Sequence, residues 1–348
     1  MKLLRAEFKK LRRLGLLPLV LLLAVGLRVC LCLLPRAREH PYSVEVYRRY
    51  CNELQGELTE EKLACLNTRR QEIEELLAAY DEMQTRYARG ELTLEEYSNF
   101  NRRHGLAQAE AGTVYYLCEK CARLEECRTF DRQIFFDTDW AELFEDSGTD
   151  LVLLLALLCI AVPAFDREYS TGSFRQLLTS KRGRAELAAA KLMAVCSSAA
   201  VLSLLLSGAR LLVFFHRCGA VYHDLPAGNV LLSDGTGSLS LLGYYLTDAA
   251  LKALTAAMYS AAACLVSILC RSTAFSFSLS FLATATPLLV LKGTESPRIA
   301  YFLAAAVWRE MYRPELPPPI FAAVTAIKML LLSAAAAALW SSVRDSRA

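Results

Sequence analysis

Long stretches of apolar residues divide this chain and set the fold that it can adopt. Apolar residues make up 54% of the 348 residues, although 22% are charged. A run of about 20 apolar residues is long enough to cross the hydrocarbon core of a bilayer as a helix. The sequence therefore predicts an all-α, polytopic membrane protein. Six transmembrane helices are expected, at Leu14–Leu34, Leu151–Phe165, Leu192–Phe215, Ala249–Cys270, Ser272–Leu291 and Ile320–Leu339. Trp340 follows the last run, where we expect it to anchor the helix at the membrane interface.

Charged residues are concentrated in one insert, residues 36–148. The insert holds 15 Lys or Arg and 24 Asp or Glu, a net charge of −9, whereas the rest of the chain holds 24 and 12, a net charge of +12. Short basic flanks of membrane helices stay in the cytoplasm. The insert is therefore predicted to be extracellular and both termini cytoplasmic, in a multi-pass protein of the plasma membrane. The predicted divisions are a cytoplasmic interfacial helix at 1–13, the first span at 14–35, the extracellular domain at 36–148, a five-helix membrane region at 149–343 and a cytoplasmic tail at 344–348.

The first 13 residues combine apolar residues at helical spacing with a basic remainder. Leu4, Phe8 and Leu11 recur on one side, and Lys and Arg fill the positions between them. A helix of this kind lies in the membrane interface with its cations toward lipid headgroups. The other interpretation is a basic tail that only fixes the orientation of the first span.

The insert is predicted to be a helical hairpin between the first and second spans. Four apolar residues recur at heptad steps: Leu66, Ile73, Tyr80 and Tyr87. Thr93 opens a capping-box pattern, which marks the start of a helix. We expect one helix over about 60–89 and a second over about 94–128, with Gly105 and Gly112 as candidate breaks in the second.

A polar segment, residues 166–190, separates the second and third apolar runs. Its pattern is an aromatic residue, a Glu, a Gly-Ser pair, a Leu pair, a Ser followed by a basic cluster, and a Lys at the next helix. The residues are Phe165, Glu168, Gly172, Ser173, Leu177, Leu178, Ser180 to Arg184, and Lys191. This pattern resembles the cytoplasmic coupling segment of ABC-2 type transporter permeases. Many members of that family carry a Pro before the Ser/Arg pair, where this chain has Thr179-Ser180-Lys181.

The resemblance implies a permease subunit of an ATP-driven exporter. Such a subunit pairs with a second permease chain, identical or different, and with a separate cytoplasmic ABC ATPase, in contact with membrane lipids. The chain has no GxxxxGK[ST] loop to bind ATP, so ATP hydrolysis is expected on the separate ATPase chain. For the permease subunit itself we expect no enzyme activity, no cofactor, no metal and no nucleic-acid partner. The residues expected to couple to the ATPase are Glu168, Gly172, Ser180, Lys181, Arg182 and Arg184. Their basic cluster suits either an acidic groove on the ATPase or anionic lipid headgroups.

The alternative function is a non-transporting membrane receptor or assembly factor whose helical ectodomain binds an extracellular partner. The 166–190 segment separates the two hypotheses, because a receptor does not need a docking loop between its second and third spans. The segment therefore favours the transporter.

Four basic residues fall in the outer halves of the predicted spans: Arg28, Arg210, Lys252 and Lys328. Asp248 is the acidic residue near them. A charge inside a bilayer is costly unless it reaches the interface, faces water or has a partner. These cations are expected either to extend to the interface or to line a hydrated translocation path suited to an anionic substrate group.

Cysteine and histidine residues leave their roles open. Five of the twelve cysteines lie in the insert: Cys51, Cys65, Cys118, Cys121 and Cys127. Either a disulfide or free thiols fit their positions. His216, Cys218, His223 and Asp224 share one predicted outer loop, for which a solvated loop is favoured over a metal site. No HExxH or GxSxG motif occurs.

Overall fold

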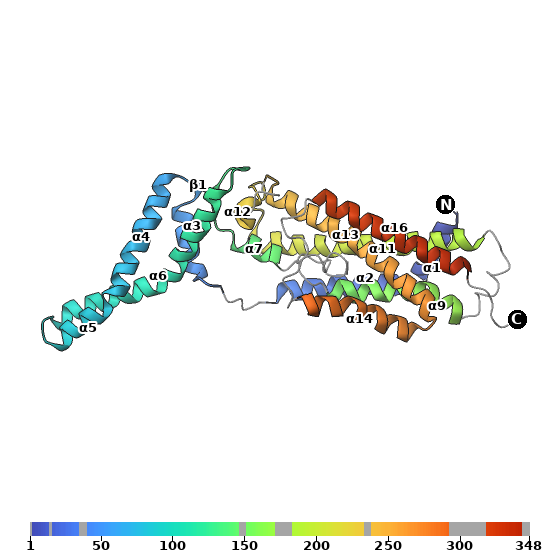
Figure 1. Ribbon diagram of the computed structural model, residues 1–348, viewed down its shortest axis with the longest axis horizontal. Helices are drawn as coiled ribbons and strands as arrows, with labels where there is room; N and C mark the ends of the chain where they lie inside the picture. Colours follow the sequence, from blue (N-terminus) through green and yellow to red (C-terminus); the bar gives the residue numbers. More distant parts are fainter. Residues whose placement is uncertain are drawn as a thin grey trace. The chain divides into compact units, whose positions relative to one another are not determined.

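The computed structural model of the chain describes residues 2–13, 16–34, 40–145, 151–170, 183–232, 238–291 and 318–342. Regular structure in these residues is α-helical apart from one pair of two-residue strands, so the all-α prediction is confirmed (Figure 1). The chain forms two compact units, which we describe separately. The membrane unit comprises Met1–Pro35, Phe144–Val221 and Tyr245–Ala348. The hairpin unit comprises Arg36–Leu143 and Tyr222–Tyr244.

The membrane unit contains long apolar helices. Its described helices are α1 (Lys2–Arg13), α2 (Leu16–Leu33), α8 (Leu151–Ala161), α9 (Pro163–Ser170), α11 (Gly183–Cys218), α13 (Leu241–Cys270), α14 (Thr273–Leu291) and α16 (Pro318–Ser342). Among the described residues, three stretches are long and apolar enough to cross a membrane: Ala185–Cys218, Leu241–Cys270 and Ala322–Ser342.

The structure does not support the predicted count of six spans. Helix α2 has 18 residues and α8 has 11, which give lengths of about 27 and 16 Å against a hydrocarbon core of about 30 Å. Helix α8 stops where it does because Pro163 has no N–H with which to continue it. The fifth predicted span is represented by the shorter apolar stretch Thr273–Ala283.

Two helices begin earlier than the apolar runs suggested. Helix α11 starts at Gly183 rather than Leu192, and α13 starts at Leu241 rather than Ala249. The Ala-rich turn before Lys191 explains the first difference, because Ala has the highest helix propensity of any residue. Part of the predicted 166–190 loop is therefore helical.

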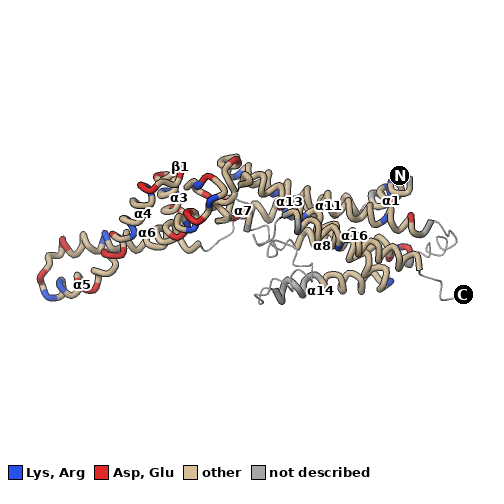
Figure 2. The backbone as a smooth tube through the Cα atoms, turned by 45° about the horizontal axis from the view of Figure 1, so that its top comes forward, with Lys and Arg blue, Asp and Glu red and all other residues tan. Residues whose placement is uncertain are grey.

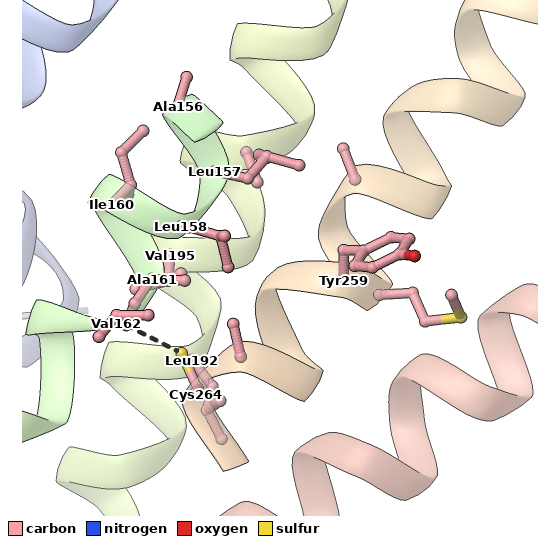
Figure 3. Packing of buried hydrophobic residues seen from close by; sticks show 14 of the residues in the cluster. Ala156, Leu157, Leu158, Ile160, Ala161, Val162, Leu192, Val195, Tyr259 and Cys264 are labelled. Carbon is pink, nitrogen blue, oxygen red and sulfur yellow. Dashed lines mark hydrogen bonds between the residues drawn. The ribbon is translucent and has the colours of Figure 1, made fainter. Parts of the chain in front are cut away.

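The core of the membrane unit forms where α8, α11 and α13 pack together (Figure 3). Leu157 and Leu158 of α8 and Leu192 of α11 belong to this core, and all three are buried. Two backbone carbonyls at the interruption between α8 and α9 accept side-chain hydrogen bonds from α13. Cys264 Sγ donates to the Ala161 carbonyl at 3.6 Å, the dashed line in Figure 3. Ser267 Oγ donates to the Val162 carbonyl at 2.8 Å, so α13 holds the break in place.

The hairpin unit carries most of the charged residues that lie in helices, along α4, α5 and α6 (Figure 2). Its described elements are α3 (Val44–Glu53), β1 (Gly56–Glu57), α4 (Glu60–Ala78), α5 (Tyr80–Ala88), α6 (Leu94–Glu126), β2 (Gln133–Ile134), α7 (Thr138–Glu145, at the unit boundary) and α12 (Gly228–Leu231). Strands β1 and β2 pair antiparallel, with Gly56 opposite Ile134.

The predicted hairpin is present, and its heptad residues face the second helix. Leu66 and Ile73 of α4 are buried in the core that α4 forms with α6. Tyr87 stacks on Tyr97 of α6, with ring centroids 4.2 Å apart. The capping box at Thr93 forms as predicted.

Two details of the hairpin differ from the prediction. The helix expected over 60–89 is divided at Ala79 into α4 and α5. The expected breaks at Gly105 and Gly112 are absent, because α6 runs through both residues. Gly112 instead allows a close approach of the backbone, since a Cβ there would lie 3.0 Å from the Pro41 carbonyl oxygen.

The predicted outer loop after α11 is partly a structural component of the hairpin unit. Asn229 on α12 is fully buried. Its Oδ1 accepts from the Gln133 N–H at 2.8 Å, and its Nδ2 donates to the Asp131 carbonyl at 3.1 Å. A Cβ on the neighbouring Gly228 would overlap the Phe130 ring. The solvated loop was expected for His216, Cys218, His223 and Asp224; His216, His223 and Asp224 are exposed, and the buried Asn229 lies beyond them.

Candidate functional site

A group of four charged residues lies where α1, α9 and α11 meet, and two of them, Glu168 and Lys191, are buried. We call it the Glu168 junction and define it as Glu7, Lys10, Glu168 and Lys191. The side chain of Glu168 is only 4% exposed. Its Oε1 accepts hydrogen bonds from Lys10 Nζ at 3.2 Å and from Lys191 Nζ. Helix α1 is thus joined to α9 and α11, more than 150 positions later in the sequence, at one carboxylate.

Lys191 is the most enclosed cation of the junction, with a side chain that is 2% exposed. It also donates to the Ala164 carbonyl at 2.9 Å and lies 3.9 Å from Glu7. Its ammonium group is 5.4 Å from the centre of the Phe165 ring, a cation–π distance. The two carboxylates balance the two ammonium groups, which is the condition under which buried charges are tolerated.

The aromatic ring under Lys191 extends this arrangement to α16. Phe165 is fully buried and meets Trp340 edge-on, with ring centroids 5.0 Å apart. Trp340 is 1% exposed. Our expectation that Trp340 is an interface anchor is therefore wrong, because its ring packs inside the unit.

A pocket opens beside the junction. Its wall is mostly apolar, and five of its twelve lining residues are charged. The lining residues are Glu7, Lys10, Leu11, Leu17, Ile160, Pro163, Ala164, Arg167, Glu168, Lys191, Ala194 and Val195. Figure 3 labels two of them, Ile160 on α8 and Val195 on α11. An apolar chamber with a charged part is suited to an amphiphilic molecule.

The structure places only part of the predicted coupling set. Glu168 is buried in the junction rather than presented on a surface. Arg184 belongs to the first turn of α11 by its backbone. Gly172, Ser180, Lys181 and Arg182 lie outside the described residues, as does the predicted tail at 344–348.

The predicted translocation-path charges are partly brought together. Arg28 of α2, Arg210 of α11 and Asp248 of α13 all interact electrostatically with Tyr245. Arg210 is buried, and Tyr245 donates to the Ser207 carbonyl at 2.8 Å. Lys252 joins this group through an ion pair with Asp248 at 2.8 Å. We call these five residues, Arg28, Arg210, Tyr245, Asp248 and Lys252, the Tyr245 cluster.

Lys328 is the fourth predicted path charge. It is half-buried on α16, and it has interactions of its own.

A third buried ion pair lies in the hairpin unit. Lys120 Nζ is 2.7 Å from Asp137 Oδ2, and the Tyr47 hydroxyl donates to Asp137 Oδ1 at 2.6 Å. Burial, followed by the nearby Asp137 charge, raises the pKa of Tyr47 well above its ordinary value. Each charged atom has a partner, so we assign this group a structural role in holding α3 and α6 to the segment before α7.

All twelve cysteines lie within the described residues, and none of them forms a disulfide. Cys51 and Cys121 are buried in the core of the hairpin unit. In these parts of the chain, no group of three or more His, Cys, Asp or Glu side chains is placed to hold a metal ion.

Comparison with known proteins found no relative of this chain. No family model, curated protein or solved structure matches the chain.

Sequence reasoning identified two members of the junction, Glu168 and Lys191, but missed Glu7 and Lys10. One signal was available. Glu7 is the only acidic residue in the first 38 positions, and a single acid in a basic helix is a candidate partner for a buried cation elsewhere.

Proposed function

We propose that this chain is the membrane-spanning permease subunit of an ABC-2 type ATP-driven exporter. The observation that carries the proposal is the ion pair between Glu168 and Lys191. These two residues bracket the segment that resembles the family's coupling segment. A segment closed at its base by a buried ion pair can pass a push from a bound partner into the helices that hold it. Here those helices are α1, α9 and α11.

The proposed topology places six spans in the plasma membrane. They are α2, the broken pair α8 and α9, α11, α13, α14 and α16. The basic first helix and the positive-inside rule assign the termini and the 166–190 segment to the cytoplasm and residues 36–148 to the outside. In this arrangement α1 lies in the cytoplasmic interface.

The proposed partners follow from the same reading. A separate cytoplasmic ABC ATPase binds and hydrolyses ATP, and a second permease chain completes the membrane part. The Tyr245 cluster then lies in the outer half of the membrane. Its three cations and one carboxylate favour an anionic group on the substrate.

A direct test is photo-crosslinking from the proposed docking segment in living cells. A photoreactive amino acid replaces Ser180, Lys181 or Arg182 in three separate variants and Leu94 in a fourth. Leu94 is a matched control because it is 71% exposed and lies in the hairpin unit. We expect Ser180 to capture a protein that carries an ABC ATPase domain, and Leu94 to capture none. Absence of any ABC ATPase from positions 180, 181 and 182 would contradict the proposal.

The receptor hypothesis keeps one observation in its favour. The hairpin unit has its own hydrophobic core around Tyr47, Leu66 and Leu117, so it can present a defined surface to an extracellular partner. Capture from Leu94, with none from the 180–182 positions, is the outcome that would favour this second function.

A further inference from the structure

One oxygen of the Glu168 junction has no hydrogen-bond partner among the described residues. Oε1 of Glu168 receives both lysine ammonium groups, whereas Oε2 is buried and receives none. Buried polar atoms in folded proteins nearly always have a partner. The negative charge of a carboxylate makes the missing donor more costly than it would be for a neutral group. The side chain of Glu168 lines the pocket described above, so the pocket is where a donor can be supplied.

The other lining residues of the pocket indicate which further chemical groups its occupant carries. Leu11, Leu17, Ile160 and Val195 form an apolar wall, which a water molecule alone leaves without contacts. Lys10 and Arg167 also line the pocket, and the Lys10 side chain is 52% exposed. The occupant therefore needs an N–H donor for the buried carboxylate, an anionic group for the cations, and an alkyl chain.

We propose that this pocket binds a phospholipid with a primary ammonium headgroup, represented by phosphatidylethanolamine. Its ammonium group donates to Glu168 Oε2, its phosphate meets Lys10 and Arg167, and one acyl chain lies against the apolar wall. A choline headgroup has no N–H and cannot make the first contact. The proposal rests on the chain being in a membrane and not on its pairing with an ATPase.

A lipid in this position would contribute to the junction itself. It would complete the hydrogen bonds of Glu168 and fill the space between α1, α9 and α11. The lipid would thus act as a structural component of the point at which the proposed coupling segment meets the membrane unit.

The test is native mass spectrometry of the purified full chain after removal of its lipids. Phosphatidylethanolamine and phosphatidylcholine with the same acyl chains are added in competition. We expect a preference of about tenfold or more for phosphatidylethanolamine, the factor that one hydrogen bond to a charged group supplies. Glu168→Gln places an amide donor where the free oxygen lies, and it should remove the preference. Glu186→Gln is the matched control, because Glu186 is exposed in the first turn of α11, and it should keep the preference.

Two further arms keep the result decisive. Leu17→Trp fills the apolar part of the pocket without touching Glu168, and it should lower the binding of phosphatidylethanolamine even if Glu168→Gln does not fold. Glycerophosphoethanolamine has the same headgroup but no acyl chains, and it should not displace the lipid. Equal binding of the two lipids by the wild-type chain would overturn the proposal. So would an unchanged preference in Glu168→Gln together with unchanged binding of phosphatidylethanolamine by Leu17→Trp, or displacement by glycerophosphoethanolamine at the concentration of the lipid.

Discussion

Glu168 and Lys191 form a buried ion pair next to an apolar pocket wall. The Lys191 ammonium group meets a carboxylate, a backbone carbonyl and an aromatic face. Loss of one member leaves the other as an uncompensated buried charge. Removing one partner is therefore more destabilising than removing both. Glu168 belongs to the set of residues expected to couple to the ATPase, and its burial indicates a structural role as well.

The first prediction removes the cation of this pair. Lys191→Met should destabilise the purified chain by about 3–5 kcal/mol, because Glu168 then keeps only the half-exposed Lys10. The double variant Lys191→Met/Glu168→Gln should recover part of the loss. Chemical denaturation in detergent measures both. Arg123→Met is the control, since Arg123 pairs with Glu119 on the exposed side of α6 and should cost about 0.5 kcal/mol or less. Equal losses for Lys191→Met and Arg123→Met would refute the buried pair.

The second prediction concerns Glu110 in the hairpin unit. Burial alone would raise the pKa of this carboxyl, but hydrogen bonds from Arg69, Arg49 and Tyr50 outweigh it, and the pKa lies below its ordinary value of 4.5. A depressed folded-state pKa contributes stability above the unfolded value and loses it as pH falls through the folded value. The chain should therefore lose stability below about pH 4.5, and Glu110→Gln should make that fall shallower. Identical pH profiles for the two proteins between pH 6 and 3 would count against this account.

At the scale of elements, the hairpin follows from patterns that can be read in the sequence. Heptad spacing and a capping box both depend on local geometry, and both predicted the helices that the structure contains. The end of α8 was equally visible, because Pro163 breaks the apolar run that we had read as one span. Burial of Asn229 could not be read locally, since its partners Asp131 and Gln133 lie almost 100 positions away.

The third prediction tests the heptad face of α4. Ile73 is fully buried, and Ile73→Asp places an unpaired charge there at a cost of several kcal/mol. Hydrogen exchange of the full chain in detergent should speed up throughout α4 and α6 of this variant. Gln71→Asp introduces the same charge at an exposed position two residues away and should leave exchange unchanged. Wild-type protection in Ile73→Asp would mean that the face is not packed.

At the scale of the whole molecule, the sequence predicted a helical protein with membrane character. It also pointed to Glu168 and Lys191 of the Glu168 junction, but not to Glu7 and Lys10. Glu168 and Lys191 were found because both belong to one short motif. Lys10 was missed because 158 positions separate it from Glu168, and no local pattern records such a contact. The count of six spans could not be obtained from the lengths of the apolar runs alone. Helix length also depends on where the backbone hydrogen bonds of a helix are interrupted, as they are at Pro163.

The most direct test of the proposed account is to determine on which side of the membrane the hairpin unit and the 166–190 segment lie. One variant retains only Cys65, an exposed residue of the hairpin unit, and has every other cysteine replaced by Ala. A second replaces Cys65 as well and carries Ser180→Cys. Both are treated with a membrane-impermeant maleimide before and after lysis of the cells. The account predicts that Cys65 reacts in intact cells, whereas the thiol at position 180 reacts only after lysis. Reaction of position 180 in intact cells, or protection of Cys65 until lysis, would contradict a permease with a cytoplasmic docking segment and an extracellular hairpin.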